Sequence, residues 1–591
     1  MLELPLYNGI GEEDSAASDA PPPLRRPETG RLLIDEAVDR LRDDTRAVRP
    51  VWLPPLPERL SLQPVVDRDR TAGDLDVVVG LEDDPAHQQQ KPWVVDLTKA
   101  GGHVAIIGSP QSGRSTLLRT IGASLALTKT PTEVAVYGMD LTGGGLRRIE
   151  GFPHVGGVAT RGDRGRLGRL LEEIGGMLAH RERVFKERGI DSVAHLRALH
   201  RAGQLPELAA ADILLLVDGY GALRQDFDDL ESAFTDIMLR ASSFGVHLVL
   251  GLTRWSEVRM AHQSLFGTRI ELRLNDPADS AIDRKLAQTI SAETPGRALT
   301  DAKTLAQVAL PVLDLVESDD IGSALEQLAE RSAAAWSGPF AAPIRLLPTD
   351  LDPAELPDPV DEPDAIPLGL RQDTMGPATW DFTRDEQHLL VLGDARSGKT
   401  NALRLIAHGL IERFTPEELA IAVVDPRGHV ADAIPEDYLA AHAKTARQAA
   451  GLASSIASEL AQRPGRTPEE NRRSPRVVVL VDDHDIVSAG GAEHLAPLVE
   501  QLPASRDTKL HIVAARPVAG AARALYGALL QGLRDTGGAT LLLSGDRAEG
   551  QILPRLYPER FPPGRGRYVR RGERPRVIQI AHLGRAKDDD R

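Results

Sequence analysis

One glycine pattern occurs twice in this chain, 285 residues apart, and each copy lies between an apolar run and a helical pattern. The first copy runs from Gly108 to Thr116 and the second from Gly393 to Thr400. Both follow the spacing G-x-x-x-x-G-K-[ST], except that Arg114 replaces the lysine in the first. Such a loop turns several backbone N–H groups toward a phosphate, and the helix that follows adds positive potential. We therefore expect two phosphate-binding units.

The sequence around each loop matches the strand–loop–helix context that such a site requires. Apolar runs at 103–107 and 388–392 precede the loops, and apolar residues at helical spacing follow them. We predict that both loops bind nucleotide; a glycine-rich turn without a ligand is the alternative. The predicted nucleotide-binding residues are Gly108, Ser109, Pro110, Gln111, Ser112, Gly113, Arg114, Ser115 and Thr116 in the first copy, and Gly393, Asp394, Ala395, Arg396, Ser397, Gly398, Lys399 and Thr400 in the second.

The repetition extends well beyond the loops. Four further landmarks recur in the same order, namely Asp140 and Asp425, Asp218 and Asp482, His247 and His511, and Pro295-Gly-Arg297 and Pro563-Gly-Arg565. A series of matched landmarks predicts tandem copies of one domain. Short β-rich runs alternate with helical stretches in both copies, which predicts the α/β class, with a mainly parallel sheet and helices on both of its faces.

Length and composition agree with two large domains and extensions, because 591 residues are too many for one core. We expect a disordered tail over 1–30, a helical and Pro-rich leader over 31–60, and a short tail over 586–591. The two domains are expected over 61–336 and 367–585. Eight prolines between Pro339 and Pro367 predict a Pro-rich extended linker over 337–366. The leader is expected to pack on the first domain or on a partner.

Composition also limits the functional classes. No apolar run approaches the roughly 20 residues needed to span a bilayer, and the N-terminus lacks a secretion signal, so we expect a soluble protein that stays where it is made. The absence of cysteine excludes disulfides and thiolate metal sites. A net charge of −16 opposes a large nucleic-acid surface. The seven arginines from Arg560 to Arg576 are therefore interpreted mainly as a solvated hairpin.

Four side chains are predicted to support Mg²⁺. Asp218 and Asp482 end buried strands, where the acid of the magnesium shell usually lies, and the hydroxyls of Ser115 and Thr400 follow the basic residue of each loop. We expect Ser115 and Asp218 to act in the first domain, and Thr400 and Asp482 in the second.

The residue after each strand-end acid bears on catalysis. A hydrolysing site of this class places a glutamate there to orient the attacking water, but this chain has Gly219 and Asp483. Glycine has no carboxylate, and aspartate is one methylene shorter; a displacement of about 1 Å can cost on the order of 10²-fold in rate. We predict two sites that hold nucleotide and cleave it slowly, with Asp483 as the candidate catalytic residue.

Other candidates carry less specific signals. Arg114 replaces a compact ammonium by a planar fork, so we expect altered or weakened nucleotide binding; codon drift in a functional loop is the alternative. Arg254 and Arg297 are candidates for reaching a nucleotide held by a neighbouring subunit, and solvated surface arginine is the alternative. His247 and His511 are expected to be structural residues of buried strands.

These features resemble a known family. The paired glycine loops, the strand-end Asp218 and Asp482, the strand opened by His247 and the Pro295-Gly-Arg297 turn resemble the FtsK/SpoIIIE group of ring-forming motor ATPases. Three further segments look like the EccC ATPases of type VII (ESX) secretion, and among them the EccCb type. These segments are Trp52-Leu-Pro-Pro-Leu56, Asp140-Leu-Thr-Gly-Gly-Gly-Leu146 and Phe152-Pro-His-Val-Gly-Gly-Val158. The resemblance spans residue 31 to about residue 583.

The resemblance implies two RecA/FtsK-like P-loop ATPase domains that use ATP and Mg²⁺. It implies a place at the cytoplasmic face of the inner membrane, beside a membrane-anchored EccCa-like subunit that supplies the first ATPase domain and most of the hydrolysis. It further implies recognition of C-terminal export signals on WXG-type helical-hairpin substrates by the last ATPase domain, in a ring or stacked oligomer. The alternative is an FtsK-type DNA-translocating ATPase. Acidity, Gly219 and the 26 residues after Arg565, too few for a winged-helix module, oppose it, so no nucleic acid partner is expected.

Overall fold

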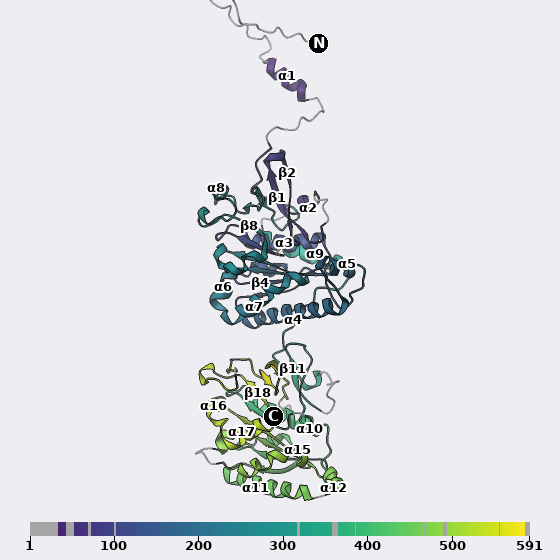
Figure 1. Cartoon of the computed structure of the whole chain (residues 1–591), viewed down its shortest axis with the longest axis vertical. Helices are drawn as coiled ribbons and strands as arrows, with labels where there is room; N and C mark the ends of the chain where they lie inside the picture. The colour runs from purple at the N-terminus through teal and green to yellow at the C-terminus, as the bar shows by residue number, and fades with distance from the viewer. Residues whose placement is uncertain are drawn as a thin grey trace, which may run out of the picture.

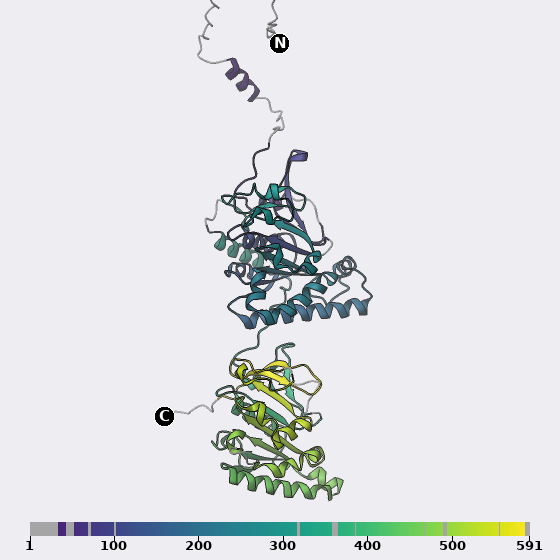
Figure 2. The ribbon, with the colours of Figure 1, turned by 60° about the vertical axis from the view of Figure 1, so that its left-hand side comes forward.

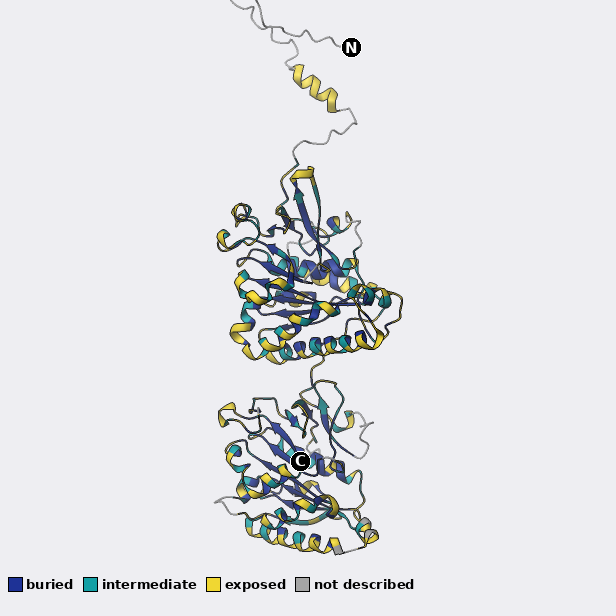
Figure 3. Ribbon diagram, in the orientation of Figure 1, coloured by how far each residue is buried: buried dark blue, intermediate teal, exposed yellow. Residues whose placement is uncertain are grey.

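The computed structural model describes residues 33–42, 53–68, 73–99, 102–315, 320–356, 365–384, 386–465, 467–488, 493–554 and 556–584. The tails expected at 1–30 and 586–591 lie outside these residues, as does Trp52. The chain forms two α/β domains that follow one another along its long axis (Figures 1 and 2). Each domain is built on a ten-stranded sheet. The buried residues concentrate on these two sheets and the sides of the helices that face them (Figure 3).

The two sheets share one strand order, which confirms the tandem repeat. The first has the order β2-β1-β10-β9-β8-β3-β7-β6-β4-β5, and the second β12-β11-β20-β19-β18-β13-β17-β16-β14-β15. The strands of the first sheet are β1 (Asp76–Asp84), β2 (Gln89–Asp96), β3 (His103–Ile107), β4 (Val134–Asp140), β5 (Val155–Thr160), β6 (Asp212–Asp218), β7 (Val246–Leu252), β8 (Phe266–Glu271), β9 (Arg297–Leu299) and β10 (Leu305–Val308). Those of the second are β11 (Ile366–Arg371), β12 (Pro377–Trp380), β13 (Leu389–Leu392), β14 (Leu419–Val424), β15 (Leu439–Ala443), β16 (Arg476–Val481), β17 (Leu510–Arg516), β18 (Ala539–Leu543), β19 (Arg565–Val569) and β20 (Arg576–Ile580).

Most strands of each sheet run parallel, as predicted. The six strands from β8 to β5 pair in parallel, and so do those from β18 to β15. The remaining four strands of each sheet pair antiparallel at one edge. The two glycine loops, which are predicted to bind phosphate, therefore leave β3 and β13 in the interior of each sheet, where the carboxyl ends of parallel strands meet.

Helices cover both faces of each sheet. The helices of the first domain are α2 (Gln63–Val66), α3 (Arg114–Thr128), α4 (Arg164–Arg188), α5 (Val193–Arg201), α6 (Tyr220–Asp226), α7 (Asp228–Arg240), α8 (Arg284–Ala287) and α9 (Ile321–Ala335). Those of the second are α10 (Lys399–Ile411), α11 (Ala446–Gln462), α12 (Pro468–Arg473), α13 (His484–Val487), α14 (Ala496–Val499), α15 (Ser505–Thr508), α16 (Ala521–Ala524) and α17 (Ala528–Asp535). In the first domain α4, α6 and α7 pack on one face, while α3 and α9 pack on the other.

The alternation of side chains along the central strands explains this two-sided core. In β6, Leu215 belongs to the cluster under α4, whereas Leu214 and Leu216 belong to the cluster under α3. Both faces are buried, so the strand reads as a continuous apolar run in the sequence.

An extended leader enters each domain beside the antiparallel edge. The N–H of Leu310 donates to the carbonyl of Leu60 at 2.7 Å, and the N–H of His582 donates to that of Leu351 at 2.7 Å. The leader preceding the first domain thus packs on it, and the carbonyls of Pro54 and Leu56 also accept hydrogen bonds from that domain. Upstream of it lies α1 (Leu33–Arg42), whose ten residues are all exposed.

The Pro-rich segment between the domains is bound to both of them. The N–H groups of Ala341 and Ile344 donate to the carbonyls of Pro153 and Gly156 in the first domain, at 2.9 and 3.0 Å. From Leu347 onward the segment contacts the second domain instead. The segment is extended, with only η7 (Pro353–Glu355) as regular structure among its described residues. Among the described residues, no helix is long and apolar enough to cross a membrane.

Candidate nucleotide sites

The backbone of each glycine loop adopts the conformation that a phosphate cradle needs. In the second loop Arg396 and Gly398 have φ values of 62° and 109°, and α10 begins at Lys399. A Cβ on Gly398 would lie 3.3 Å from the backbone nitrogen of Gly564, so both the left-handed φ and the close approach require glycine there. Gly113 repeats this arrangement, with φ 107° and its own neighbour Gly296.

The recurrent Pro-Gly-Arg turn is hydrogen-bonded to the glycine loop of its own domain. The N–H of Gly564 donates to the carbonyl of Ser397 at 2.9 Å, and Gly296 donates to Ser112 at the same distance. Each bond links one carbonyl of a glycine loop to the Pro-Gly-Arg turn of its own domain. Sequence reasoning identified the turn as a landmark but did not assign it this contact.

The arginine of each turn holds the leader. The Arg297 guanidinium donates to Gln307 Oε1 at 3.0 Å and to the carbonyl of Leu56 at 3.0 Å. Arg565 makes the matching bonds to Gln579 and Leu347 at 3.1 and 2.8 Å. These bonds occupy Nε and Nη2 of Arg297 within its own chain, and the predicted contact of Arg297 with a neighbouring subunit stays a prediction. Arg254 is exposed just beyond β7, and its predicted contact stays a prediction.

The hydroxyl and the strand-end acid meet in both domains. Thr400 Oγ1 donates to Asp482 Oδ2 at 2.7 Å, and Ser115 Oγ donates to Asp218 Oδ2. Burial raises the pKa of both carboxyls, and the hydroxyl bonds oppose that rise. The tertiary structure thus joins the residues that the sequence assigned to Mg²⁺ in two pairs, one in each domain.

The donor set fits Mg²⁺ held together with nucleotide phosphates. Asp218 Oδ1 is buried and has no hydrogen-bond partner within the described residues, so it is an oxygen acceptor without a donor. The described residues contain no group of three or more histidines and acids that could hold a metal alone. One hydroxyl and one carboxylate per site are what a phosphate-bound Mg²⁺ uses, because the phosphates and water complete its shell.

The basic residues of the two loops lie differently. Lys399 Nζ donates to the carbonyl of Asp394 in its own loop at 3.1 Å. Arg114 reaches past its loop, and its Nη1 donates to Thr253 Oγ1 at 2.8 Å, at the end of the neighbouring strand β7. The longer fork therefore has a neutral partner outside the phosphate cradle. Thr253 carried no signal in the sequence, because its role depends on strand order.

The residue after the strand-end acid has the same backbone conformation in both domains but a different side chain. Gly219 and Asp483 each directly precede a helix and have positive φ values, 81° and 47°. A Cβ on Gly219 would lie 2.5 Å from Thr142 Cγ2. In the second domain Asp483 Oδ2 lies 2.8 Å from Arg427 Nε. The candidate catalytic carboxylate of Asp483 is thus paired with a cation. In the first domain, a side chain at the position of Gly219 would collide with Thr142.

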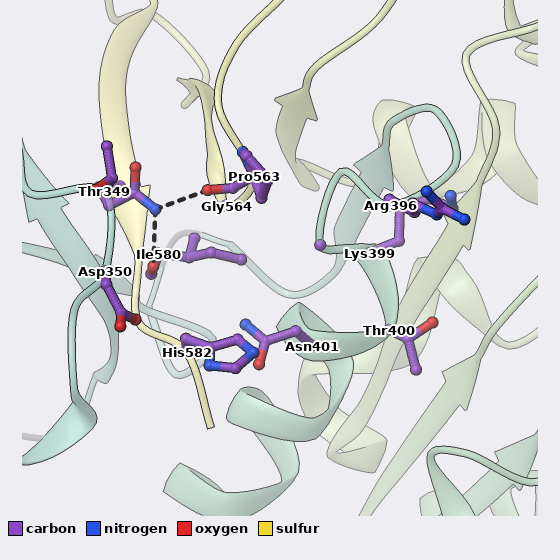
Figure 4. Close-up of a pocket in the computed structure, with 12 residues that line it drawn as sticks. Thr349, Asp350, Arg396, Lys399, Thr400, Asn401, Pro563, Gly564, Ile580 and His582 are labelled. Atoms are coloured by element: carbon purple, nitrogen blue, oxygen red, sulfur yellow. Dashed lines mark hydrogen bonds between the residues drawn. The ribbon is translucent and has the colours of Figure 1, made fainter. Parts of the chain in front are cut away.

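A cavity of about 450 Å³ opens beside the second loop. Figure 4 shows Lys399 and Thr400 on one side of it, and Asp350 of the leader with His582 beyond β20 on the other. Asn401 joins the two sides, because its amide donates to the carbonyl of Ala581 at 2.7 Å. The cavity is large enough for a small ligand and combines a phosphate cradle with an acid and an imidazole. Sequence reasoning missed Asp350, Asn401 and His582, which carry no motif.

The two strand histidines are structural in geometry. His247 is buried and lies 2.8 Å from the carbonyl of Gly102 and 3.2 Å from Asp212 Oδ1. His511 lies 3.1 Å from the carbonyl of Gln387, and burial lowers its pKa to about 4. Neither imidazole reaches the glycine loop by any of these contacts, in agreement with the structural interpretation.

The fold and the twin loops define a tandem P-loop ATPase architecture, and comparison with known proteins agrees. Residues 77–302 and 356–481 match the FtsK/SpoIIIE family. The chain therefore belongs to the FtsK/SpoIIIE family, and within it is a homologue of the EccC and EccCb proteins of ESX secretion.

Three relatives illustrate the range of lengths. The chain is 37% identical to the ESX secretion system protein EccC of Thermomonospora curvata, over 95% of this chain and 45% of that one. It is 37% identical to the ESX-4 protein EccC4 of Mycobacterium tuberculosis, over 93% of this chain and 44% of that one. It is 32% identical to the ESX-1 protein EccCb1 of Mycolicibacterium smegmatis, over 94% of this chain and 96% of that one. The chain thus spans less than half the length of the first two relatives.

Two solved structures share the arrangement. ATPases 2 and 3 of Thermomonospora curvata EccC, solved in complex with a signal sequence peptide, match with a TM-score of 0.74 and 37% identity, covering 90% of this chain and 97% of that one. The cytoplasmic domain of the same protein matches with a TM-score of 0.76, covering 90% of this chain and 64% of that one. Two tandem ATPase domains of the EccC type are thereby shown.

Proposed function

We propose that this chain binds ATP and captures C-terminal export signals of WXG-type substrates for a type VII secretion machine. In this proposal it works at the cytoplasmic face of the inner membrane with a membrane-anchored EccCa-like ATPase. One observation carries the proposal. Both domains match ATPases 2 and 3 of an EccC protein whose structure was solved with a signal sequence peptide.

The second domain is the stronger ATP site. Its loop amides and Lys399 would take the phosphates, and Thr400 with Asp482 would hold Mg²⁺. The bound ion would neutralise charge on the β- and γ-phosphate oxygens. Asp350 and His582 line the far side of the same cavity. In the first domain Arg114 bonds Thr253, so we expect weaker binding there.

Low intrinsic turnover follows from the residues beside the Mg²⁺ acids. Gly219 has no group to orient water, and the Asp483 carboxylate is paired with Arg427. ATP would therefore act mainly by holding each domain in one conformation, while a partner ATPase performs most of the hydrolysis. This assignment agrees with the geometry at both sites.

The outer edge of each sheet suggests where an export signal binds. In the first domain the interdomain segment covers the edge strand β5, and Ala341 and Ile344 are buried there. The corresponding edge strand of the second domain is β15. Among the described residues, no segment hydrogen-bonds to its outer side. An extended peptide could add there in the way that the interdomain segment adds to β5.

The apolar positions below these edges support the same surface. Counted from the capping residues Asp163 and Thr445, Leu170 and Ile174 of α4 correspond to Leu452 and Ile456 of α11. The first pair is fully buried, in the same cluster as Ala341 and Ile344. The second pair is only partly buried. We propose that a substrate signal covers Leu452 and Ile456 as the interdomain segment covers its own pair.

A peptide titration tests the proposal. A labelled peptide from the C-terminus of a WXG-type substrate should bind the full chain, and the Leu452→Asp/Ile456→Asp variant should weaken binding at least tenfold by fluorescence anisotropy. Ser454→Asp/Ser455→Asp places the same two charges on exposed positions of α11 and should leave affinity within twofold. Equal affinity of wild type and double variant would refute this receptor surface.

The proposed partner follows from how the relatives are organised. The matched domains of Thermomonospora curvata EccC are numbered 2 and 3, and the chain covers only 64% of that protein's cytoplasmic domain. From the likeness of this chain to EccCb1 of Mycolicibacterium smegmatis, we propose that an EccCa-like subunit acts with it as a partner ATPase, and we expect a ring or stacked oligomer in the assembled machine. DNA translocation is not favoured, because the net charge is −16.

A further inference from the structure

Helix α1 (Leu33–Arg42) has an apolar side with nothing packed against it in the described structure. Its exposed fractions are 80% for Leu33, 63% for Ile34, 42% for Val38 and 70% for Leu41. Ile34, Val38 and Leu41 have the i, i+4, i+7 spacing of one helical stripe. A ten-residue helix is marginal in water by itself, because nucleation costs more than a few hydrogen bonds return. Figures 1 and 3 show α1 apart from both domains and exposed along its length. Such a stripe requires a surface to pack against.

The repeat shows which element α1 corresponds to. Leu60 and Leu351 make the same backbone bond at the entrance of their domains, and they are 291 residues apart. Leu56 and Leu347, which accept from the matching arginines, have the same separation. Carried upstream without a gap, this offset places α1 on residues 324–333, inside α9 (Ile321–Ala335). Helix α1 is therefore the repeat equivalent of α9.

The side chains agree with this register. The inward positions of α9, Leu325, Leu328 and Ala329, are buried, and they correspond to Ile34, Ala37 and Val38. The outward positions also correspond, and they carry the same charges. The matched outward pairs are Asp35 and Glu326, Asp39 and Glu330, and Arg40 and Arg331, all exposed. One helical pattern thus occurs twice, once packed on a domain as α9 and once exposed as α1.

Helix α9 packs on the domain that precedes it in the chain. Its apolar side lies against α3 and the 3-10 turn η2 (Gly145–Ile149), in the cluster that contains Leu146 and Ile149. Arg148 of that turn pairs with Glu326 at 3.5 Å. The chain then continues along β5 of the same domain before entering the next one. The helix therefore completes the upstream domain, and only the leader after it belongs to the downstream domain.

We infer that α1 completes an upstream ATPase core of the same family, which lies outside the described residues. Its Ile34–Val38–Leu41 stripe would pack in the groove between the helix after that core's glycine loop and the adjacent 3-10 turn. The inference rests on the proposed function, which assigns this core to the EccCa-like partner. The contact would then be a helix exchange, in which this chain supplies α1 to complete the core of the partner. It would place the partner next to the N-terminal side of the first domain.

A second copy of this chain could compete for α1. Within the described residues no helix follows β20, so the second domain leaves the matching face beside α10 without an equivalent of α9. Docking there would join copies head to tail. The experiment below separates this outcome from binding to the partner.

The test measures binding of the full chain to the purified ATPase domain of the EccCa-type subunit from the same organism. Ile34→Asp/Val38→Asp/Leu41→Asp should raise the Kd at least tenfold, with unchanged Tm, because α1 contacts neither described domain. Two controls should stay within twofold of wild type. Glu36→Ser/Arg40→Ser alters the outward side, and Ile34→Leu/Val38→Ala installs the residues of α9 at the same positions.

Three results would overturn the inference: no binding by the wild-type chain, equal binding by the triple variant, or self-association of the wild type that the triple variant abolishes. The signal-peptide titration on the same samples separates this inference from the proposed function. Normal peptide binding with no effect of the triple variant removes only the helix exchange. Loss of peptide binding by the wild type removes the proposed function.

Discussion

The Arg427 guanidinium and the Asp483 carboxylate lie 2.8 Å apart, Nε to Oδ2, directly beside the acid that would support Mg²⁺. The equivalent pair in the first domain is Thr142 and Gly219, where a side chain on the glycine would collide with the threonine. The two domains therefore block the water-orienting position in different ways. In the first domain the methyl group of Thr142 occupies the space beside Gly219. In the second domain the Asp483 carboxylate is paired with the Arg427 guanidinium.

Releasing Asp483 should raise turnover. In the Arg427→Ala/Asp483→Glu variant the carboxylate is longer and lacks its ion-pair partner, so we expect ATP hydrolysis by the full chain to rise at least fivefold. Steady-state phosphate release measures this. Arg427→Ala alone should give a smaller rise. Rapid hydrolysis by the wild-type chain, or no gain in the double variant, would contradict the explanation.

Lys399→Ala should weaken ATP binding at the second site at least tenfold, because the ammonium that faces the β- and γ-phosphates is lost. Within the described part of the chain, the hydrogen bond of the Lys399 side chain is to its own loop carbonyl, so the free energy of unfolding should change by less than about 0.5 kcal/mol. Isothermal titration and thermal melting measure the two quantities. Unchanged affinity would show that Lys399 does not contact nucleotide.

Arg114→Lys should tighten nucleotide binding at the first site. The lysine side chain is too short to keep the hydrogen bond to Thr253, so its ammonium would be able to face the phosphates. Titration in a Lys399→Ala background isolates this site, and we expect at least a threefold lower Kd. A weaker or unchanged affinity would mean that the arginine itself is the better phosphate ligand here.

Acid should destabilise the protein through its buried histidines. Burial lowers the pKa of His103, His484 and His511 to about 4 and that of His388 to about 3. Because each folded-state pKa lies below the unfolded value near 6.5, their stabilisation is complete above pH 6.5. It is lost as the pH falls from there toward 4. A single such group loses on the order of 2 kcal/mol between pH 7 and pH 5.

Thermal melts across that range check the histidine prediction. His511→Gln should lower Tm at pH 7, because the imidazole is packed against Trp380 and Phe382, and should flatten the pH dependence. His429→Gln alters an exposed histidine and should change neither. A His511→Gln profile parallel to that of the wild type would assign the acid sensitivity elsewhere.

Removing the arginine that binds the leader should lower the stability of a domain while leaving its glycine loop intact. Arg565→Ala deletes the bonds to the carbonyls of Leu347 and Pro348, and we expect a loss of about 1–3 kcal/mol in the second domain. Arg297→Ala should do the same in the first domain. Denaturant melts followed by domain-specific probes measure both. An unchanged midpoint in either variant would show that the arginine does not anchor its leader.

Much of the fold was readable because its signals are local. The glycine spacing, the apolar strands and the helices after the loops are set by neighbouring residues, so the α/β class and the tandem repeat followed from the sequence. The acids predicted to support Mg²⁺ could be named from the sequence too, because each closes an apolar run, although one strand separates β6 from β3 and β16 from β13. What was missed had no local pattern. Asp350 and His582 lie 232 residues apart, yet they line one cavity.

By itself the sequence determined that two phosphate loops occur in equivalent strand–loop–helix units, since backbone turning and apolar periodicity act over a few residues. Only the tertiary structure decided what the recurring Arg297 and Arg565 hold, and that the Asp483 carboxylate is paired with Arg427. It also decided that the interdomain segment is bound to the domains on either side. These contacts join residues separated by tens to hundreds of positions. They depend on which strands become neighbours, and a linear pattern does not contain that information.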